Sequence, residues 1–162
     1  MTARLESEKH EPEVQLRSFL EKFDPRIQKH FRAVRSALRK RFPTATELAY
    51  DYADSLVIAY SPTDRPYDAS VSIAAREEGV RLYVMSIQGK PLPDPKKLLQ
   101  GSGKQARFVP LDAASQLALP DVKALIAAAL DRAKVPFPSK GKGSLIIRSD
   151  AAKRQARKRP TR

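Results

Sequence analysis

Basic side chains recur at helical spacing in one stretch of the sequence. They are Arg26, Lys29, Arg32, Arg35 and Arg39, and no acid lies between positions 24 and 47. This spacing places the five side chains along one side of a helix, with their charged ends in water. Rows of Lys and Arg bind polyanions through charge and counterion release. The sequence therefore predicts a positive ridge for an anionic partner, nucleic acid included, while charge runs also serve solubility alone.

The C-terminal segment carries most of the remaining positive charge. Residues 134–162 contain ten Lys or Arg and one acid, Asp150, within a net charge of +13 for all 162 residues. Like charges mixed with Pro and Gly oppose a packed core. We predict a basic, mostly disordered tail over 135–162, in which 145–147 could add a short strand. Its anion-binding candidates are Arg154, Arg157, Lys158 and Arg159.

The run Gly101-Ser102-Gly103-Lys104 resembles part of a phosphate-binding loop. The full motif needs Gly at 98 and Ser or Thr at 105, where this chain has Leu98 and Gln105. We therefore exclude a nucleoside triphosphate site. A weaker alternative is anion binding by backbone N–H groups with Lys104 and Arg107. A tight turn before an edge strand is the favoured interpretation.

A tyrosine-rich segment offers the second group of candidate residues. Tyr50 and Tyr52 lie on one predicted strand and Tyr60 on the next, with Asp51 and Asp54 in the connection, and together they could form a ligand surface. Such tyrosines more often bury their rings and keep a polar tip wet. An enzyme that acts on a small polar substrate near Tyr50 and Arg107 is a third possibility for function.

The residue inventory argues against catalysis. The chain has no Cys, only two His, at positions 10 and 30, and no Gly-x-Ser-x-Gly motif. A thiol nucleophile and a Cys-ligated metal site are thereby excluded. We expect no catalytic residues, no cofactor and no metal site, and we interpret His30 as a structural or surface residue.

No apolar run approaches the roughly 20 residues that span a membrane. The first residues are charged and lack the apolar region of a signal peptide. We expect a cytoplasmic protein without a membrane partner, and a flexible N-terminus over 1–11.

Periodicity predicts helices, then strands, then a helix. Apolar residues recur at helical spacing over 12–23. A second helix is expected from Pro25, after the cap Asp24, to about Phe42, where Pro43 stops it. A short helix is expected at 96–100, and a last helix follows Pro120. Alternating segments predict strands at 47–52, 56–60, 69–75, 80–85 and 107–111.

This order predicts an α+β domain over 12–134. Its antiparallel sheet of about five strands would carry the N- and C-terminal helices on one face.

Three segments resemble the bacterial YdhG-like family, a domain of unknown function. They are Tyr50–Pro62, the stretch Leu92-Pro93-Asp94-Pro95, and Leu98–Arg107, followed by a basic C-terminus after Ser144-Leu145-Ile146-Ile147. The resemblance covers roughly 13–134. It implies an architecture similar to frataxin, and some family members have been proposed as iron chaperones.

The sequence departs from an iron chaperone where the ligands should be. Hard cations take oxygen ligands, whereas the long predicted helix is basic. The acids Glu6, Glu8, Glu11 and Glu13 lie at or near the expected flexible N-terminus. We therefore expect a non-catalytic binding or accessory protein with an anionic partner, and keep a frataxin-like iron chaperone as the alternative.

Overall fold

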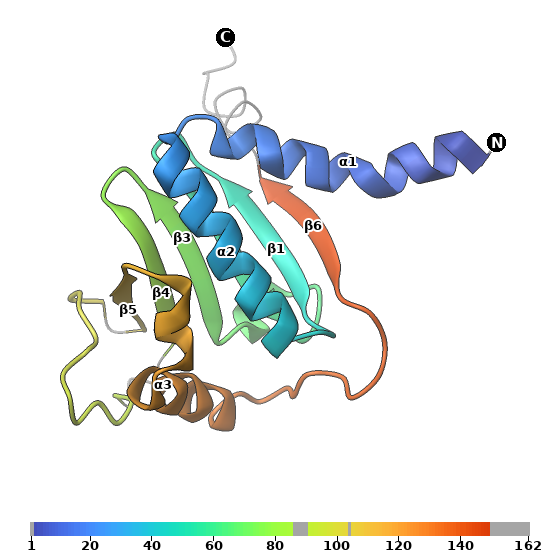
Figure 1. The fold of residues 1–162 in the computed structure, drawn as a ribbon. Helices are drawn as coiled ribbons and strands as arrows, with labels where there is room; N and C mark the ends of the chain where they lie inside the picture. Colours follow the sequence, from blue (N-terminus) through green and yellow to red (C-terminus); the bar gives the residue numbers. More distant parts are fainter. Residues whose placement is uncertain (1, 86–90, 104, 150–162) are drawn as a thin grey trace, which may run out of the picture.

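The computed structural model describes residues 2–85, 91–103 and 105–149, and the side chains between 11 and 148 within these ranges. Figure 1 shows helices packed against one sheet, with the N-terminal end of the chain extending away from it. The elements are α1 (Thr2–Leu20), α2 (Pro25–Arg41), β1 (Thr46–Asp51), β2 (Ser55–Ser61), η1 (Pro66–Asp68), β3 (Val71–Arg76), β4 (Gly79–Met85), β5 (Ala106–Leu111), η3 (Ala114–Ala118), α3 (Pro120–Asp131) and β6 (Ser144–Ser149).

Local sequence signals explain α2. The Asp24 carboxylate accepts hydrogen bonds from the backbone N–H groups of Arg26 and Ile27 at 2.7 and 3.2 Å, so it caps the helix as predicted. The apolar stripe buries Phe31, Val34 and Leu38 against the sheet. The bounds predicted for this helix are confirmed to within one residue.

The first helix is longer than its sequence pattern predicts. α1 begins at Thr2, whereas we expected a flexible segment over 1–11 and a helix from Pro12, so that start is wrong. Residues 3–9 are mostly good helix formers, and Pro12 is carried inside the helix. Leu16 and Leu20 of α1 are buried in the core.

The sheet has the strand order β5-β4-β3-β2-β1-β6. Neighbours from β1 to β5 pair antiparallel, which confirms the α+β class. The sixth strand, β6, pairs parallel with β1, so the expectation of about five strands in a fully antiparallel sheet is corrected.

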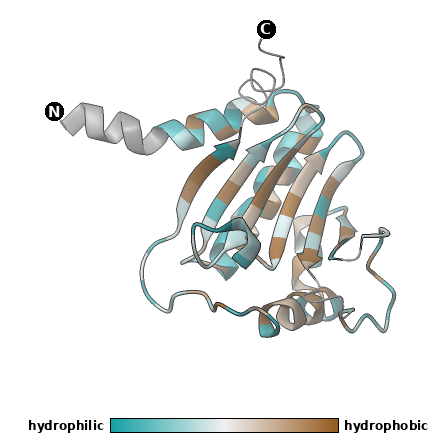
Figure 2. Cartoon of the chain, turned by 180° about the vertical axis from the view of Figure 1, so that it is seen from behind, coloured by the Kyte–Doolittle hydropathy of each residue, from teal (hydrophilic) through white to brown (hydrophobic). Residues whose placement is uncertain are grey.

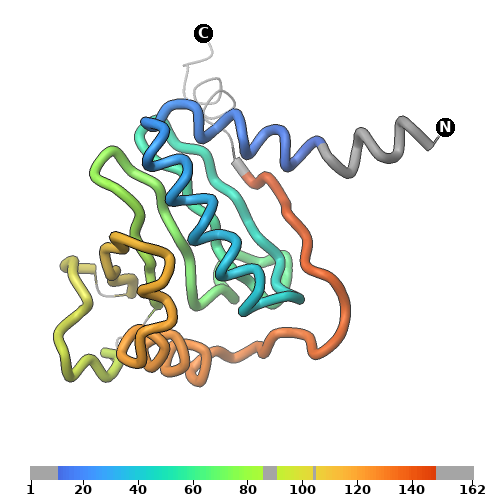
Figure 3. Tube along the Cα trace, in the orientation of Figure 1, coloured from blue at the N-terminus to red at the C-terminus, as the bar shows by residue number. Residues whose placement is uncertain are grey.

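The same strand corrects the predicted tail. Residues 144–149 complete a sheet edge rather than belonging to a disordered segment, because Leu145 and Ile147 pack against the core. Figure 3 follows the long connection from α3 around the edge of the sheet to this strand. Phe137 in that connection stacks on Phe42, with ring centroids 5.0 Å apart. Residues 150–162 of the predicted tail lie outside the described residues.

The two faces of the sheet differ. α2 and α3 both contact β3 and β4, and the buried core lies between these helices and the sheet. The opposite face, seen in Figure 2, carries none of the three helices. We call it the open face. No helix in the described ranges has the length and apolar composition that a membrane crossing needs.

One predicted helix does not form. Residues 96–99 are a loop, in which the Asp94 carboxylate accepts hydrogen bonds from the N–H groups of Leu98 and Leu99, both at 2.9 Å. The aspartate satisfies donors that a helix would have used, so the expectation of a helix at 96–100 is wrong.

Candidate functional site

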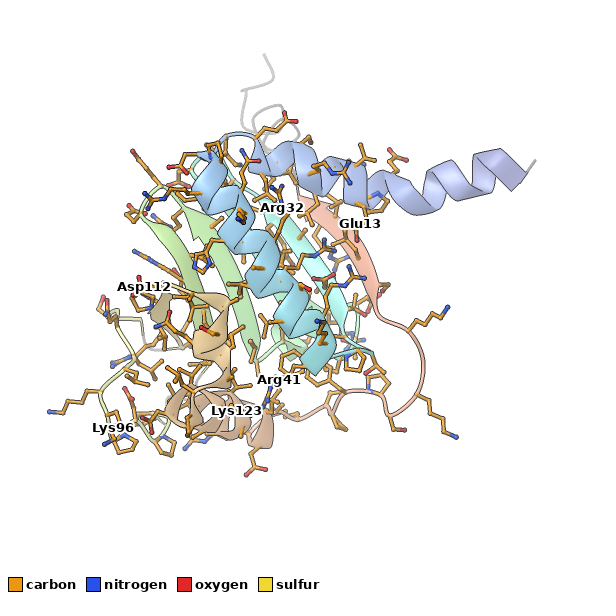
Figure 4. All side chains as sticks on the ribbon, in the orientation of Figure 1. Glu13, Arg32, Arg41, Lys96, Asp112 and Lys123 are labelled. Atoms are coloured by element: carbon orange, nitrogen blue, oxygen red, sulfur yellow. The ribbon has the colours of Figure 1, made fainter. Side chains whose placement is uncertain are left out.

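Three cations at the start of α2 face solvent. Arg26, Lys29 and Arg32 are exposed, and no acid among the described residues lies within ion-pair distance of them. Figure 4 labels Arg32 on the side of α2 that faces the viewer. Their spacing of three residues keeps them along one side of the helix, as the sequence predicts. We call these three side chains the free cations.

Arg35, one turn further along α2, has a different environment. Its Nη1 and Nη2 donate to the two carboxylate oxygens of Glu13 at 2.9 and 2.8 Å. Its Nε and Nη2 donate to the Glu47 carboxylate at 3.0 and 2.9 Å. The Arg35 side chain is only 12% exposed, so the prediction that its charged end faces water is wrong.

Glu47 lies at the centre of this charged cluster. It is buried on β1, and it also accepts a hydrogen bond from the Tyr60 hydroxyl at 3.0 Å. Arg39 approaches the carboxylates of Glu47 and Glu13 at 3.6 and 3.8 Å but keeps 55% of its side chain exposed. We call Glu13, Arg35, Arg39, Glu47 and Tyr60 the buried network. It joins α1, α2 and the sheet.

The ionisation of the network follows its contacts. Hydrogen bonds from Arg35 lower the pKa of Glu13. Burial on its own lowers the pKa of Arg35, but the hydrogen bonds to Glu13 and Glu47 outweigh it and raise this pKa. Burial raises the pKa of the Tyr60 phenol, and the adjacent Glu47 charge raises it further. Glu13 and Arg35 are therefore charged, and Tyr60 is neutral, around pH 7.

A hollow of about 400 Å³ runs along this side of α2. It is lined by Arg32, Arg35, Ser36, Arg39 and Lys40. Lys40 is exposed, so it adds a cation to the lower part of the helix. An anionic group in this hollow would meet Arg32 and Lys40 directly and would compete with Glu13 for Arg39.

Steric constraints explain the two glycines in the loop before β5. Gly101 has φ +99°, which favours glycine, and a Cβ at Gly103 would lie 2.6 Å from the Ala106 carbonyl oxygen. These two glycines are thus required by the turn before β5. The exposed Arg107 has its Nε 3.4 Å from the Gly103 carbonyl oxygen, and Lys104 lies outside the described residues.

The tyrosine-rich segment divides between two roles. Asp51 is buried and pairs with the Lys22 ammonium, so it ties β1 to the connection between α1 and α2. Tyr50 and Tyr52 are half-buried, and their rings stack with centroids 6.4 Å apart. Tyr50 and Arg107 are not brought together, because they stand on β1 and β5 with three strands between them.

Of the two histidines, the structure describes the surroundings of His30. The His30 Nε2 lies 2.7 Å from the Leu111 carbonyl oxygen, which supports a structural role. A second hollow, of about 570 Å³, lies where the α1–α2, β1–β2 and β3–β4 connections meet. Several of its charged residues contact the protein itself: Asp24 caps α2, Lys22 binds Asp51, and Arg76 pairs with Glu78. Asp54 and Glu77 also line it and are exposed.

Sequence reasoning missed the two acids of the buried network. Glu13 was placed at the edge of a flexible segment. Glu47 shares its strand face with Ala49 and Asp51, and this period of two was the one signal that could have placed it toward the long helix.

No group of three or more His, Asp or Glu side chains in the described part of the chain could hold a metal ion. No protein-family model, curated protein or solved structure matches this chain.

Proposed function

We propose that this protein is a non-catalytic binding protein that holds polyanions, nucleic acid among them, on the outer side of α2. The observation that carries the proposal is the exposure of the free cations Arg26, Lys29 and Arg32 without an acid partner among the described residues. Exposed cations of this kind can displace counterions from a phosphate backbone.

The length of the ridge suits an extended anion. Arg26 and Lys40 are 14 positions apart, which corresponds to about 21 Å along an α-helix. Such a row meets several phosphates of one strand, while its side chains offer no pattern for reading bases. Binding without sequence preference is therefore expected.

The course of β6 supports a contribution from the C-terminal residues. β6 runs parallel to β1 and ends at the side of the sheet where α2 begins (Figure 1). The Arg and Lys residues of 150–162 follow β6 in the sequence and lie outside the described residues. Membership of the YdhG-like family stays a prediction.

The alternative function, a frataxin-like iron chaperone, has less support. The acids that pair with basic side chains of α2, Glu13 and Glu47, already bind Arg35, and such paired carboxylates are poor ligands for a cation. Calorimetric titration with ferrous iron separates the two functions. We expect at most weak millimolar binding, and saturable micromolar binding that requires acids of the folded domain would favour the chaperone.

The proposal is tested with labelled random-sequence duplex DNA and fluorescence anisotropy. Replacement of the free cations by Gln (R26Q/K29Q/R32Q) is expected to weaken binding at least tenfold at 50 mM salt. A matched variant removes the same charge elsewhere, at the exposed Lys96, Lys97 and Lys123 (Figure 4 labels two of them). This control should bind almost as the natural protein does. Equal weakening in both variants would mean that overall charge, and not the ridge, binds DNA.

A further inference from the structure

The strand register places a row of flat side chains on the open face of the sheet. Tyr83 on β4 lies opposite Phe108 on β5, and Arg81 lies two residues before Tyr83 on the same face. On the far side of the sheet centre, Tyr50 on β1 lies opposite Val57 on β2. The open face therefore carries aromatic groups near both of its edges.

The first group forms a compact cluster. The Arg81 guanidinium carbon lies 4.0 Å from the centroid of the Phe108 ring. An Arg81 nitrogen, Nη1, donates to the Tyr83 hydroxyl at 3.3 Å, and the Tyr83 and Phe108 rings have centroids 5.5 Å apart. All three side chains are half-buried, so each keeps part of its surface in solvent. We call them the Arg81 cluster.

Small side chains separate this cluster from Tyr50. The open-face residues of the two central strands, in the rows that join these groups, are Val57, Ala59, Ser72 and Ala74. Three strand spacings separate β4 from β1, which is about 14 Å. Ala59 and Ala74 are buried, so the Arg81 cluster and Tyr50 are two separate, partly exposed groups on this face.

The charge of the open face favours an anion. Alternation along the strands assigns Arg81 to this face, together with Arg76, whose charge is paired with Glu78. The acids of the described strands, Glu47 and Asp51, lie on the covered face, opposite Tyr60 and Leu56. An aromatic ligand that also carries negative charge therefore fits this face better than a neutral one.

We propose that the open face binds single-stranded nucleic acid by stacking unpaired bases on the Arg81 cluster and on Tyr50. Bases stack on aromatic rings and on guanidinium planes without regard to sequence, because every base has a flat face. In a duplex these faces are covered by neighbouring pairs, so this surface selects single strands. The inference does not depend on the α2 ridge, which lies on the other side of the sheet and binds charge.

The test compares two probes of equal charge. One is a labelled thymidine 12-mer, and the other is a 12-mer with the same phosphates and no bases. We expect the thymidine strand to bind more tightly, by roughly five- to 150-fold for each base that stacks. Tyrosine fluorescence should be quenched by the thymidine strand and not by the abasic strand, and no Trp interferes with this signal. Equal affinity for the two probes would overturn the proposal.

Two variants assign the effect to the cluster. Phe108→Ser removes a ring, and Arg81→Lys keeps the charge while it removes the guanidinium plane. Both should reduce the preference for the thymidine strand, whereas Tyr83→Phe should retain it. Arg81→Lys keeps the test decisive if Phe108→Ser does not fold. A preference that is unchanged in Arg81→Lys would contradict the proposal.

The outcomes separate this proposal from that for α2. R26Q/K29Q/R32Q should weaken both 12-mers by the same factor and leave the preference between them intact. If the protein binds the abasic strand and duplex DNA but shows no preference for the thymidine strand, the α2 ridge is the binding surface and the open face is not. A base preference without duplex binding would do the reverse. Concentration-dependent dimers that Phe108→Ser abolishes, without a base preference, would show that a second copy occupies the face.

Discussion

Arg32 and Arg35 are neighbours on one helix, yet the fold uses their charges in opposite ways. Arg32 is exposed, with no described acid at ion-pair distance, whereas Arg35 makes four hydrogen bonds to two carboxylates. The difference arises from position on the helix, because Arg35 lies one step closer to the apolar stripe and reaches α1 and β1. A count of basic residues on a helix therefore overestimates the charge that a partner can meet.

The largest effect on stability is expected for Arg35, whose charge is paired with carboxylates inside the protein. Arg35→Ala should lower the free energy of unfolding by about 3–5 kcal/mol, because it leaves the buried Glu47 without its main partner. Arg32→Ala should change it by less than about 0.5 kcal/mol. Urea denaturation followed by circular dichroism measures both. Similar losses of stability in the two variants would contradict the distinction between the paired Arg35 and the free cation Arg32.

The C-terminal segment also divides into two parts, β6 and the residues that follow it. Truncation after Lys142 removes β6 with Leu145 and Ile147, and should cost roughly 2–3 kcal/mol, or about 10 °C in melting temperature. Truncation after Ser149 keeps β6 and should leave the melting temperature unchanged within about 2 °C. A Lys142 truncation as stable as the full chain would show that β6 adds nothing to the core.

Tyr60→Phe tests the innermost contact of the buried network. It removes a hydrogen bond to a buried carboxylate, and should destabilise the protein by about 1.5–3 kcal/mol at pH 7. An unfolded tyrosine ionises near pH 10, whereas burial raises the pKa of Tyr60 in the folded protein. Tyr60 stabilisation is therefore complete below about pH 10 and is lost as the pH rises further.

Thermal unfolding between pH 8 and 11 measures this dependence. Tyr60→Phe should lose less stability than the natural protein over this range. An identical alkaline loss in both proteins would indicate that the phenol ionises as readily in the folded state as in the unfolded state.

The smallest effect is expected for Glu13→Gln. Arg35 lowers the pKa of Glu13, so the stabilisation by its carboxylate is present above the unfolded pKa near 4.3 and is lost as the pH falls through the lowered value. Because Glu13 is partly exposed, its loss should cost less than about 1 kcal/mol at pH 7. The difference from the natural protein should vanish in acid, as thermal unfolding between pH 2 and 7 would show.

The same variant should bind duplex DNA more tightly. Removal of an acid beside Arg39 and Arg35 should raise the affinity about two- to fivefold at low salt, because a single surface charge has a modest effect. Weaker binding by Glu13→Gln would mean that the Glu13 contact organises the ridge and does not compete with the anion.

How much could be predicted from the sequence depends on how far apart the contacting residues are along the chain. The α2 helix was predictable because its cap and apolar stripe are local signals, and the strands from β1 to β5 because alternation and turns mark each one. For β6 the sequence offered a short strand at 145–147 only as an alternative to a disordered tail, since these three apolar residues gain a partner only when the chain returns to β1. Arg35 was misplaced for the same reason, because its partners are 22 and 12 positions away.

The open face depends on register in the same way. The aromatic residues at 50, 83 and 108 are ordinary strand residues in the sequence, and only pairing of the strands brings two of them together. Their common surface could not be inferred from spacing along the chain.

The salt dependence of duplex binding tests the central claim most directly. If about six side chains meet phosphates, the affinity of the natural protein should fall with salt at a log–log slope near −5 between 50 and 300 mM. R26Q/K29Q/R32Q should reduce the magnitude of this slope by about 2.7, while the Lys96/Lys97/Lys123 control keeps it and all three proteins unfold at the same urea concentration. An unchanged slope in R26Q/K29Q/R32Q, or no duplex binding at 50 mM salt, would contradict polyanion binding by α2.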